Sequence, residues 1–355
     1  MGEDIYVVAP QSITRVLFRH ISILPYRQEY KTPTGNKYVV YRPYSISFGK
    51  LRKRLSFISD IINRFFINKC IKGIAPDILY AHFWQNALRV LNYAAKGHKP
   101  IFVACGEGDD AMEEMMYTIS ETTKEMLKEN VKGVICVSSQ NRNKCVNYAL
   151  ADKEKTVVIP NAVDVSLFHH NERNNRLREQ LGVNKDDFLI LFVGSFTERK
   201  GCIRLAKAVD KLNDSQVKIV FIGKPFPGYE FDFSCKGIVF KGEMEHENLP
   251  EYYLCADIFV LPTLNEGCCN AIVEALACGI PVISSNRPFN EDILNEHNAV
   301  LVDPENVDEI AEAISLLKRD EELLKEKKKY CIQHATQYSI KDRANKIMDF
   351  IYANV

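Results

Sequence analysis

The sequence predicts an α/β fold of two halves, each built on a mostly parallel sheet that helices cover on both faces. Short apolar segments alternate with helical patterns along the chain, which is typical of such sheets. The alternation occurs twice, once on each side of a polar segment near the middle. The chain has 355 residues, 46% of them hydrophobic, which is enough for two full cores.

The apolar segments define the expected strands. In the first half they lie at residues 5–10, 39–43, 77–82, 101–104, 133–138 and 157–160, with helical segments such as 85–96 between them. In the second half they lie at residues 189–193, 217–223, 238–242, 258–262 and 281–285. The polar, charged stretch between the halves is expected to be a linker. The predicted division is a first domain at 1–164, a linker at 165–187, a second domain at 188–335 and a final helical segment at 336–355.

Two glutamates stand eight residues apart in the second half. Glu266 lies in a Gly-containing loop after an apolar strand, and Glu274 lies in the helix that follows. A loop that opens a helix offers unpaired amides and the positive end of the helix dipole, which favour a diphosphate. Carboxylates beside such a site suit sugar and ribose hydroxyls, so the pattern indicates a nucleotide sugar. The alternative is a pair of surface glutamates.

A second loop, at residues 194–201, also joins an apolar strand to a helix and carries Arg199 and Lys200. These cations could reach the same diphosphate from the neighbouring strand and neutralise charge on a departing nucleotide. The alternative is a solvated charge cluster, although the helix dipole disfavours cations at a helix N-terminus.

The segment at 261–284 resembles the E-x7-E signature of the retaining glycosyltransferases of family 4, which have the GT-B fold. The resemblance implies two Rossmann-like domains that face each other across a cleft, with the acceptor on the first, the nucleotide sugar on the second, and the last helix crossing back. It further implies that Glu266 contacts the transferred sugar, Glu274 the ribose, and the amides of Gly267 and Cys268 the diphosphate. Cys269 and Asn270 complete this donor-binding loop.

The loop at 194–201 resembles the family's glycine-rich loop, which implies donor contacts from Gly194 and Ser195. Many members carry Arg directly after the first Gly, so here the cationic role falls on Arg199 and Lys200. The segment at 240–244 resembles the family segment that holds the nucleotide base, which places Met244 at the base.

Three further residues are candidates in the first half. Glu107 stands where many relatives have a His that contacts the transferred sugar, or is a turn residue. His82 resembles a recurrent cleft position, or is a buried core histidine. Asn161 lines the cleft or caps a turn. The family's usual first strand, loop and helix have no counterpart before residue 3, so we expect either a shortened member or a start at an internal Met.

The sequence favours neither a metal nor a cofactor. It contains no Asp-x-Asp, CxxC, HExxH, GxGxxG or P-loop pattern, so cations and helix ends are expected to replace a metal. The eleven cysteines are scattered and no secretory leader precedes them, which indicates a reducing cytoplasm. No run of eighteen apolar residues occurs. We expect no nucleic-acid partner.

Charge is distributed unevenly although the net charge is zero. Residues 1–100 contain sixteen Lys and Arg against five Asp and Glu, a balance of +11. The basic stretch at 50–54 leads into a segment with apolar residues at helical spacing: Leu55, Ile58, Ile61, Ile62, Phe65 and Phe66. This segment either contacts an anionic membrane at its inner face or packs on its own domain.

The predicted function is transfer of a hexose or N-acetylhexosamine, with retention and without metal, from a UDP- or GDP-sugar to a hydroxyl of a glycan or lipid-linked glycan in surface polysaccharide biosynthesis. One alternative is a catalytically impaired subunit that binds nucleotide sugars. Another is a GT-B-like nucleotide-sugar epimerase, which needs an acid/base set that the sequence does not reveal.

Overall fold

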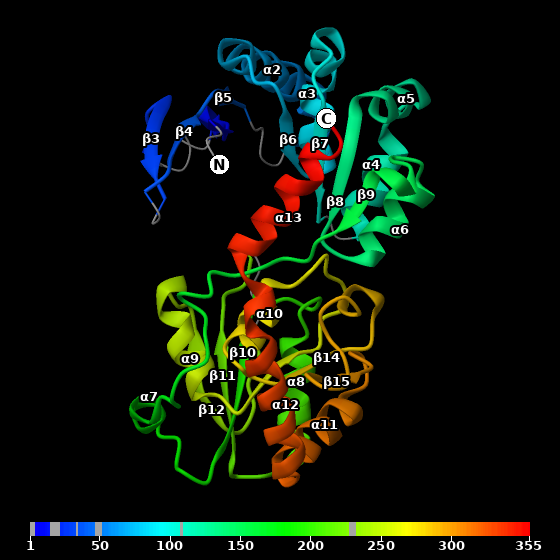
Figure 1. The fold of residues 1–355 in the computed structure, drawn as a ribbon. Helices are drawn as coiled ribbons and strands as arrows, with labels where there is room; N and C mark the ends of the chain where they lie inside the picture. The colour runs from blue at the N-terminus through cyan, green and yellow to red at the C-terminus, as the bar shows by residue number, and fades with distance from the viewer. Residues whose placement is uncertain (1–3, 15–21, 33–34, 47–51, 107–108, 227–231) are drawn as a thin grey trace.

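The computed structural model describes residues 4–14, 22–32, 35–46, 52–106, 109–226 and 232–355. The molecule has two halves, one above the other in Figure 1, which the chain joins at the waist. Each half contains a parallel sheet with helices on its faces, as the sequence predicts. The segment of the predicted site that carries Glu107 lies outside the described residues.

The C-terminal half is built on one six-stranded parallel sheet in the order β12-β11-β10-β13-β14-β15. Its strands are fully apolar at the centre because helices cover both faces. The strands are β10 (Phe188–Val193), β11 (Val217–Ile222), β12 (Ile238–Gly242), β13 (Ile258–Leu261), β14 (Val282–Ser285) and β15 (Ala299–Val302). The α-helices are α7 (Asn175–Gln180), α8 (Cys202–Leu212), α9 (Leu249–Cys255), α10 (Asn270–Ala277), α11 (Val307–Arg319) and α12 (Glu321–His334). Short 3-10 helices are η3 (His246–Asn248), η4 (Pro288–Asn290) and η5 (Ala335–Tyr338).

The N-terminal half divides its strands among three sheets instead of the one that the sequence suggests. The orders are β6-β7-β8-β9, β1-β4-β3 and β2-β5, and no described strand pairs β1 with β6. The strands are β1 (Ile5–Val8), β2 (Gln11–Ser12), β3 (Arg27–Lys31), β4 (Lys37–Tyr41), β5 (Tyr44–Ser45), β6 (Leu79–His82), β7 (Ile101–Cys105), β8 (Val131–Cys136) and β9 (Thr156–Val158). The helices are α2 (Arg52–Ile74), α3 (Trp84–Gly97), α4 (Asp109–Thr118), α5 (Glu121–Asn130), α6 (Ser139–Asn147) and η2 (Lys153–Lys155). Among the described strands β1 lies at the edge of its sheet, and its side chains Ile5, Tyr6 and Val7 are exposed.

Residues 165–187, expected to be a linker, pack instead on the C-terminal half. Phe168, Leu177 and Val183 join its core. Arg178 of α7 is buried, with its Nη1 atom 3.3 Å from Oδ2 of Asp257. The segment is polar overall, so its composition does not predict this packing. Only a few buried apolar side chains anchor it to the C-terminal half.

The chain passes between the halves twice, and the two passes touch. The amide of Val163 donates to the Tyr338 carbonyl at 2.8 Å, and the amide of Ile340 donates to the Val163 carbonyl at 2.9 Å. After this contact α13 (Ile340–Tyr352) runs up to the N-terminal half (Figure 1), where Ile347 and Ile351 pack with buried residues of β7 and β8.

Candidate functional site

The two predicted donor loops lie side by side because β10 pairs directly with β13. Each loop follows the carboxyl end of its strand, which is where parallel α/β sheets bind ligands. Backbone hydrogen bonds join the loops: the amide of Leu264 donates to the Arg199 carbonyl at 2.8 Å, and the Thr263 hydroxyl donates to the same carbonyl at 3.2 Å. The sequence-based expectation that both loops serve one site is therefore geometrically possible.

Glu266 is the residue that the cationic side chains of this site contact. One of its oxygens, Oε1, lies 2.6 Å from Lys200 Nζ, 2.9 Å from Arg199 Nη1 and 2.9 Å from the Thr263 hydroxyl. The Lys200 and Glu266 side chains are mostly buried, whereas that of Arg199 is 43% exposed. The other oxygen, Oε2, has no hydrogen-bond partner among the described residues, so it can accept a bond from a ligand hydroxyl.

Two helix N-termini flank this charge cluster. α8 begins after Gly201, whose φ is +78°, and α10 begins after Cys269; no side chain caps either helix. Uncapped amides attract anions, so both ends suit phosphate groups. Lys200 therefore lies at a helix N-terminus with Glu266 as its counter-ion, which explains two cations at a position that the helix dipole disfavours.

The remaining predicted donor residues surround these helix ends. Gly194 and Ser195 follow β10 directly and are half-buried. Cys268 and Cys269 precede α10; burial raises the pKa of the Cys268 thiol to about 12, which keeps it a neutral, unreactive group. Asn270 is exposed at the first position of the helix.

Glu274 lies one turn into α10 and is buried. Its Oε2 accepts a hydrogen bond from the Tyr253 hydroxyl at 2.9 Å, and its Oε1 lies 3.4 Å from His246 Nε2. Burial holds the pKa of Tyr253 well above its ordinary value, so this hydroxyl remains a donor. Met244 follows β12 and is half-buried against the same core. The sequence pattern gave no signal for His246 or Tyr253, because neither belongs to a motif.

The N-terminal half meets the donor loops at two places. Asn161 donates from Nδ2 to the Cys268 carbonyl and to Asn270 Oδ1, both at 2.9 Å, so it joins the halves instead of capping a local turn. The carbonyl of Gly106 lies so close to Gly267 that a Cβ atom added there would stand 2.6 Å from it.

A third contact also links the halves, and no sequence motif predicted it. The carboxylate of Asp292 accepts hydrogen bonds from the backbone amide and the hydroxyl of Ser139, each at 2.6 Å. It thereby caps the N-terminus of α6 from the other half of the molecule.

His82 and Phe83 end β6 on the N-terminal side of the site. The interpretation of His82 as a buried core residue is wrong, because it is exposed; partial desolvation and then the nearby Arg343 lower its pKa. Phe83, which sequence reasoning missed, has φ +69° and ψ 149°, a conformation that is essentially restricted to glycine. Its ring is 47% exposed and lies next to Gly106. Strained backbone positions cluster at functional sites, so Phe83 is a further candidate residue of the predicted site.

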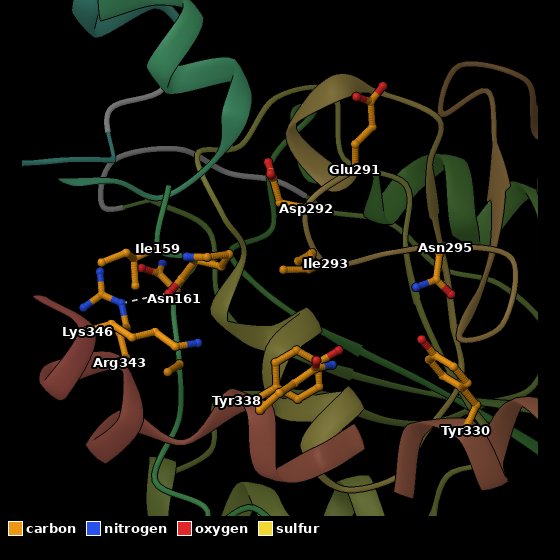
Figure 2. A pocket seen from close by; sticks show the side chains of 13 residues that line it. Ile159, Asn161, Glu291, Asp292, Ile293, Asn295, Tyr330, Tyr338, Arg343 and Lys346 are labelled. Carbon is orange, nitrogen blue, oxygen red and sulfur yellow. Dashed lines mark hydrogen bonds between the residues drawn. The ribbon is translucent and has the colours of Figure 1, made fainter. Parts of the chain in front are cut away.

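A separate cavity of about 260 Å³ lies at the waist and is shown in Figure 2. Arg343 and Lys346 of α13 lie at one end, near Asn161, and Glu291 and Asp292 lie at another. Apart from Asn161, none of the predicted site residues in the described part of the chain lines it.

Family models match both halves of the chain. The model described as glycosyl transferases group 1 matches residues 173–338, and the model described as glycosyltransferase family 4 matches residues 20–167. The first match contains both donor loops, and the second contains His82 of β6 and Gly106, which follows β7.

Curated relatives are similar over most of their length. TuaC of Bacillus subtilis, whose name assigns it to teichuronic acid biosynthesis, is 26% identical over 89% of this chain and 80% of its own. An Escherichia coli protein named UDP-Gal:alpha-D-GlcNAc-diphosphoundecaprenol alpha-1,3-galactosyltransferase is 24% identical over 84% of this chain and 81% of its own.

Solved structures share the fold at low identity. HepE of Anabaena in complex with UDP has a TM-score of 0.72 at 17% identity, covering 88% of this chain and 86% of that one. Sucrose-phosphate synthase of Thermosynechococcus elongatus has a TM-score of 0.72 at 20% identity, covering 93% and 85%. The predicted GT-B fold is confirmed by this likeness.

Proposed function

Because the chain belongs to the group 1 glycosyltransferases and has their GT-B fold, we propose that it moves a hexose or N-acetylhexosamine from a UDP- or GDP-sugar to a hydroxyl of a glycan or glycolipid, with retention and without a metal. The observation that carries the proposal is the cluster of Lys200, Arg199 and Glu266 between the N-termini of α8 and α10.

In this proposal each part of the cluster has one role. The uncapped helix ends and the two cations hold the diphosphate and stabilise the charge that develops as the nucleoside diphosphate departs. The free Oε2 atom of Glu266 accepts a hydrogen bond from a hydroxyl of the sugar, and Glu274 accepts hydrogen bonds from the ribose hydroxyls. The acceptor hydroxyl attacks the face that the leaving group vacates, which retains the anomeric configuration.

UDP is the better supported of the two nucleotides. The HepE structures hold UDP and UDP-glucose, and the Escherichia coli relative is named for a UDP-sugar. The same relative acts on a diphosphoundecaprenol-linked sugar by its name, and TuaC is named for a surface polymer. These names support a lipid-linked glycan as acceptor, with Phe83 as a platform on which an acceptor sugar ring stacks.

The surface of α2 supports contact with the membrane that carries such a lipid. Ile58, Ile61 and Phe65 recur at helical spacing and are each about half exposed or more, at 48%, 52% and 63%. Arg64 and Lys69, also exposed, lie beside them. An apolar stripe with flanking cations suits the interface of an anionic bilayer. No described helix is long and apolar enough to cross a membrane.

Incubation with a panel of UDP- and GDP-sugars tests the proposal. We expect slow hydrolysis of one donor. The released sugar should have the same anomeric configuration as in the donor, as followed by NMR, and EDTA should leave the rate unchanged. Binding without any turnover, with or without glycan acceptors, would favour an impaired binding subunit. Conversion of the donor into its epimer would favour an epimerase, and inversion at the anomeric carbon would exclude a retaining transferase.

A further inference from the structure

Three cysteines far apart in the sequence meet inside the N-terminal half. Cys105 ends β7, Cys136 ends β8, and Cys145 lies in α6. Cys105 and Cys136 are paired residues of adjacent parallel strands, so their side chains leave the same face of the sheet. All three sulfur atoms lie within 4.8 Å of one another, and Cys105 and Cys145 are 3.4 Å apart at Sγ. None of the three residues is exposed to solvent.

These separations match the geometry of one metal ion. A metal–sulfur bond of about 2.3 Å places the sulfur atoms of a trigonal site about 4.0 Å apart. The 3.4 Å between the sulfur atoms of Cys105 and Cys145 is shorter than this value and no pair exceeds 4.8 Å, so shifts of less than about 1 Å would bring each pair to it. We propose that Cys105, Cys136 and Cys145 form a three-thiolate site for a thiophilic monovalent ion, Cu(I).

The surroundings favour Cu(I) over Zn²⁺. Zinc sites in proteins are almost always four-coordinate, with protein ligands or water. Among the described residues no further His, Cys, Asp or Glu joins the three thiols, and their complete burial keeps solvent water from serving as a fourth ligand. Soft thiolate ligands in a trigonal, dry site suit Cu(I), which does not require a fourth ligand.

The environment also accommodates the negative charge of the ligands. The cations Arg142 and Lys144 act on the cluster from the same helix, α6. Each thiol that becomes a ligand releases its proton to solvent, so binding weakens as the pH falls.

An ion at this position would tie together two of the segments that touch the C-terminal half. β7 leads into Gly106, whose carbonyl lies against Gly267, and α6 begins at Ser139, which binds Asp292. We therefore expect the ion to stabilise the N-terminal half. It lies outside the donor site and is not a reactant in glycosyl transfer.

Titration of the reduced, full-length chain with Cu(I) under anaerobic conditions tests the site. With a chromophoric Cu(I) chelator as competitor, the wild type should remove one copper ion per chain and should melt at a higher temperature once loaded. Cys145→Ala should bind at least about tenfold more weakly. The matched control is Cys331→Ala, since Cys331 is equally buried but lies in α12 of the other half.

Circular dichroism shows whether each variant is folded, and Cys145→Ser serves if the alanine variant is not. X-ray absorption at the copper edge of the loaded, folded protein gives an independent readout: three sulfur neighbours at about 2.3 Å are expected. Three outcomes would overturn the site: no copper uptake by the wild type, equal weakening in Cys331→Ala, or tighter binding of Zn²⁺ than of Cu(I). None of these outcomes bears on the proposed glycosyl transfer.

Discussion

Replacement of Lys200 tests the charge cluster at the donor site. Lys200 Nζ lies 2.6 Å from Glu266, and its side chain is only 13% exposed. At an effective dielectric constant near 20, the Lys200 ammonium and a diphosphate charge about 4 Å away would interact by roughly 4 kcal/mol. Loss of one preorganised group that stabilises transition-state charge typically lowers kcat by about 10²–10³. We expect Lys200→Ala to lower donor hydrolysis and transfer by that factor.

The folded state should tolerate the change. Glu266 keeps Arg199 and the Thr263 hydroxyl as partners, so no buried carboxylate is left unpaired. The free energy of unfolding should therefore fall by no more than about 1 kcal/mol.

The assay is release of nucleoside diphosphate in a coupled spectrophotometric measurement, with thermal unfolding in parallel. Lys207→Ala is the matched control, because Lys207 is exposed on the same helix, α8. Lys200→Arg should recover part of the rate, since the charge is kept but the geometry changes. A folded Lys200→Ala protein with kcat within threefold of the wild type would refute the role of this cation.

Three other changes probe the N-terminal side. Gly267→Ala places a Cβ atom 2.6 Å from the Gly106 carbonyl, so we expect the halves to separate. The radius of gyration from X-ray scattering should increase and transfer should be at least about tenfold slower. An unchanged radius of gyration contradicts this expectation. Phe83→Gly removes the backbone strain and the ring together, so we expect a free energy of unfolding within about 1 kcal/mol of wild type. The acceptor KM should rise about fivefold while the donor KM stays constant. Phe83→Tyr should restore the acceptor KM. His82 has a folded-state pKa below its ordinary value of 6.5, so folding favours its neutral form and the free energy of unfolding falls as the pH drops below that value. Denaturant titrations should show a smaller decrease in this free energy for His82→Gln than for the wild type. Equal decreases would exclude His82 as a cause.

The sequence predicts the C-terminal half well because its determinants are local. Each donor loop lies between a continuous apolar strand and a helix, and the helix expected directly after residue 201 is the observed α8. The meeting of Arg199 and Lys200 with Glu266 also follows, since adjacent parallel strands bring their loops to one edge.

The features that the sequence does not predict depend on contacts between distant residues. Nothing in the composition of residues 165–187 shows that Phe168 and Val183 enter the core of the second half. Cys105, Cys136 and Cys145 follow no spacing pattern, because a sheet and a helix bring them together. Phe83 reads as one of many apolar residues after a strand, and only its backbone angles distinguish it.

The two hydrogen-bonded chain passes at Val163 and Ile340 give the halves a pivot in the backbone itself, whereas the contacts at Gly267 and Asp292 must part if the halves open. Rotation of the halves about this pivot keeps its two backbone hydrogen bonds. Sliding of one half along the other would break both hydrogen bonds at once. Separation on opening should therefore be smallest beside this pivot and largest at the rim farthest from it. A large substrate would enter from that rim.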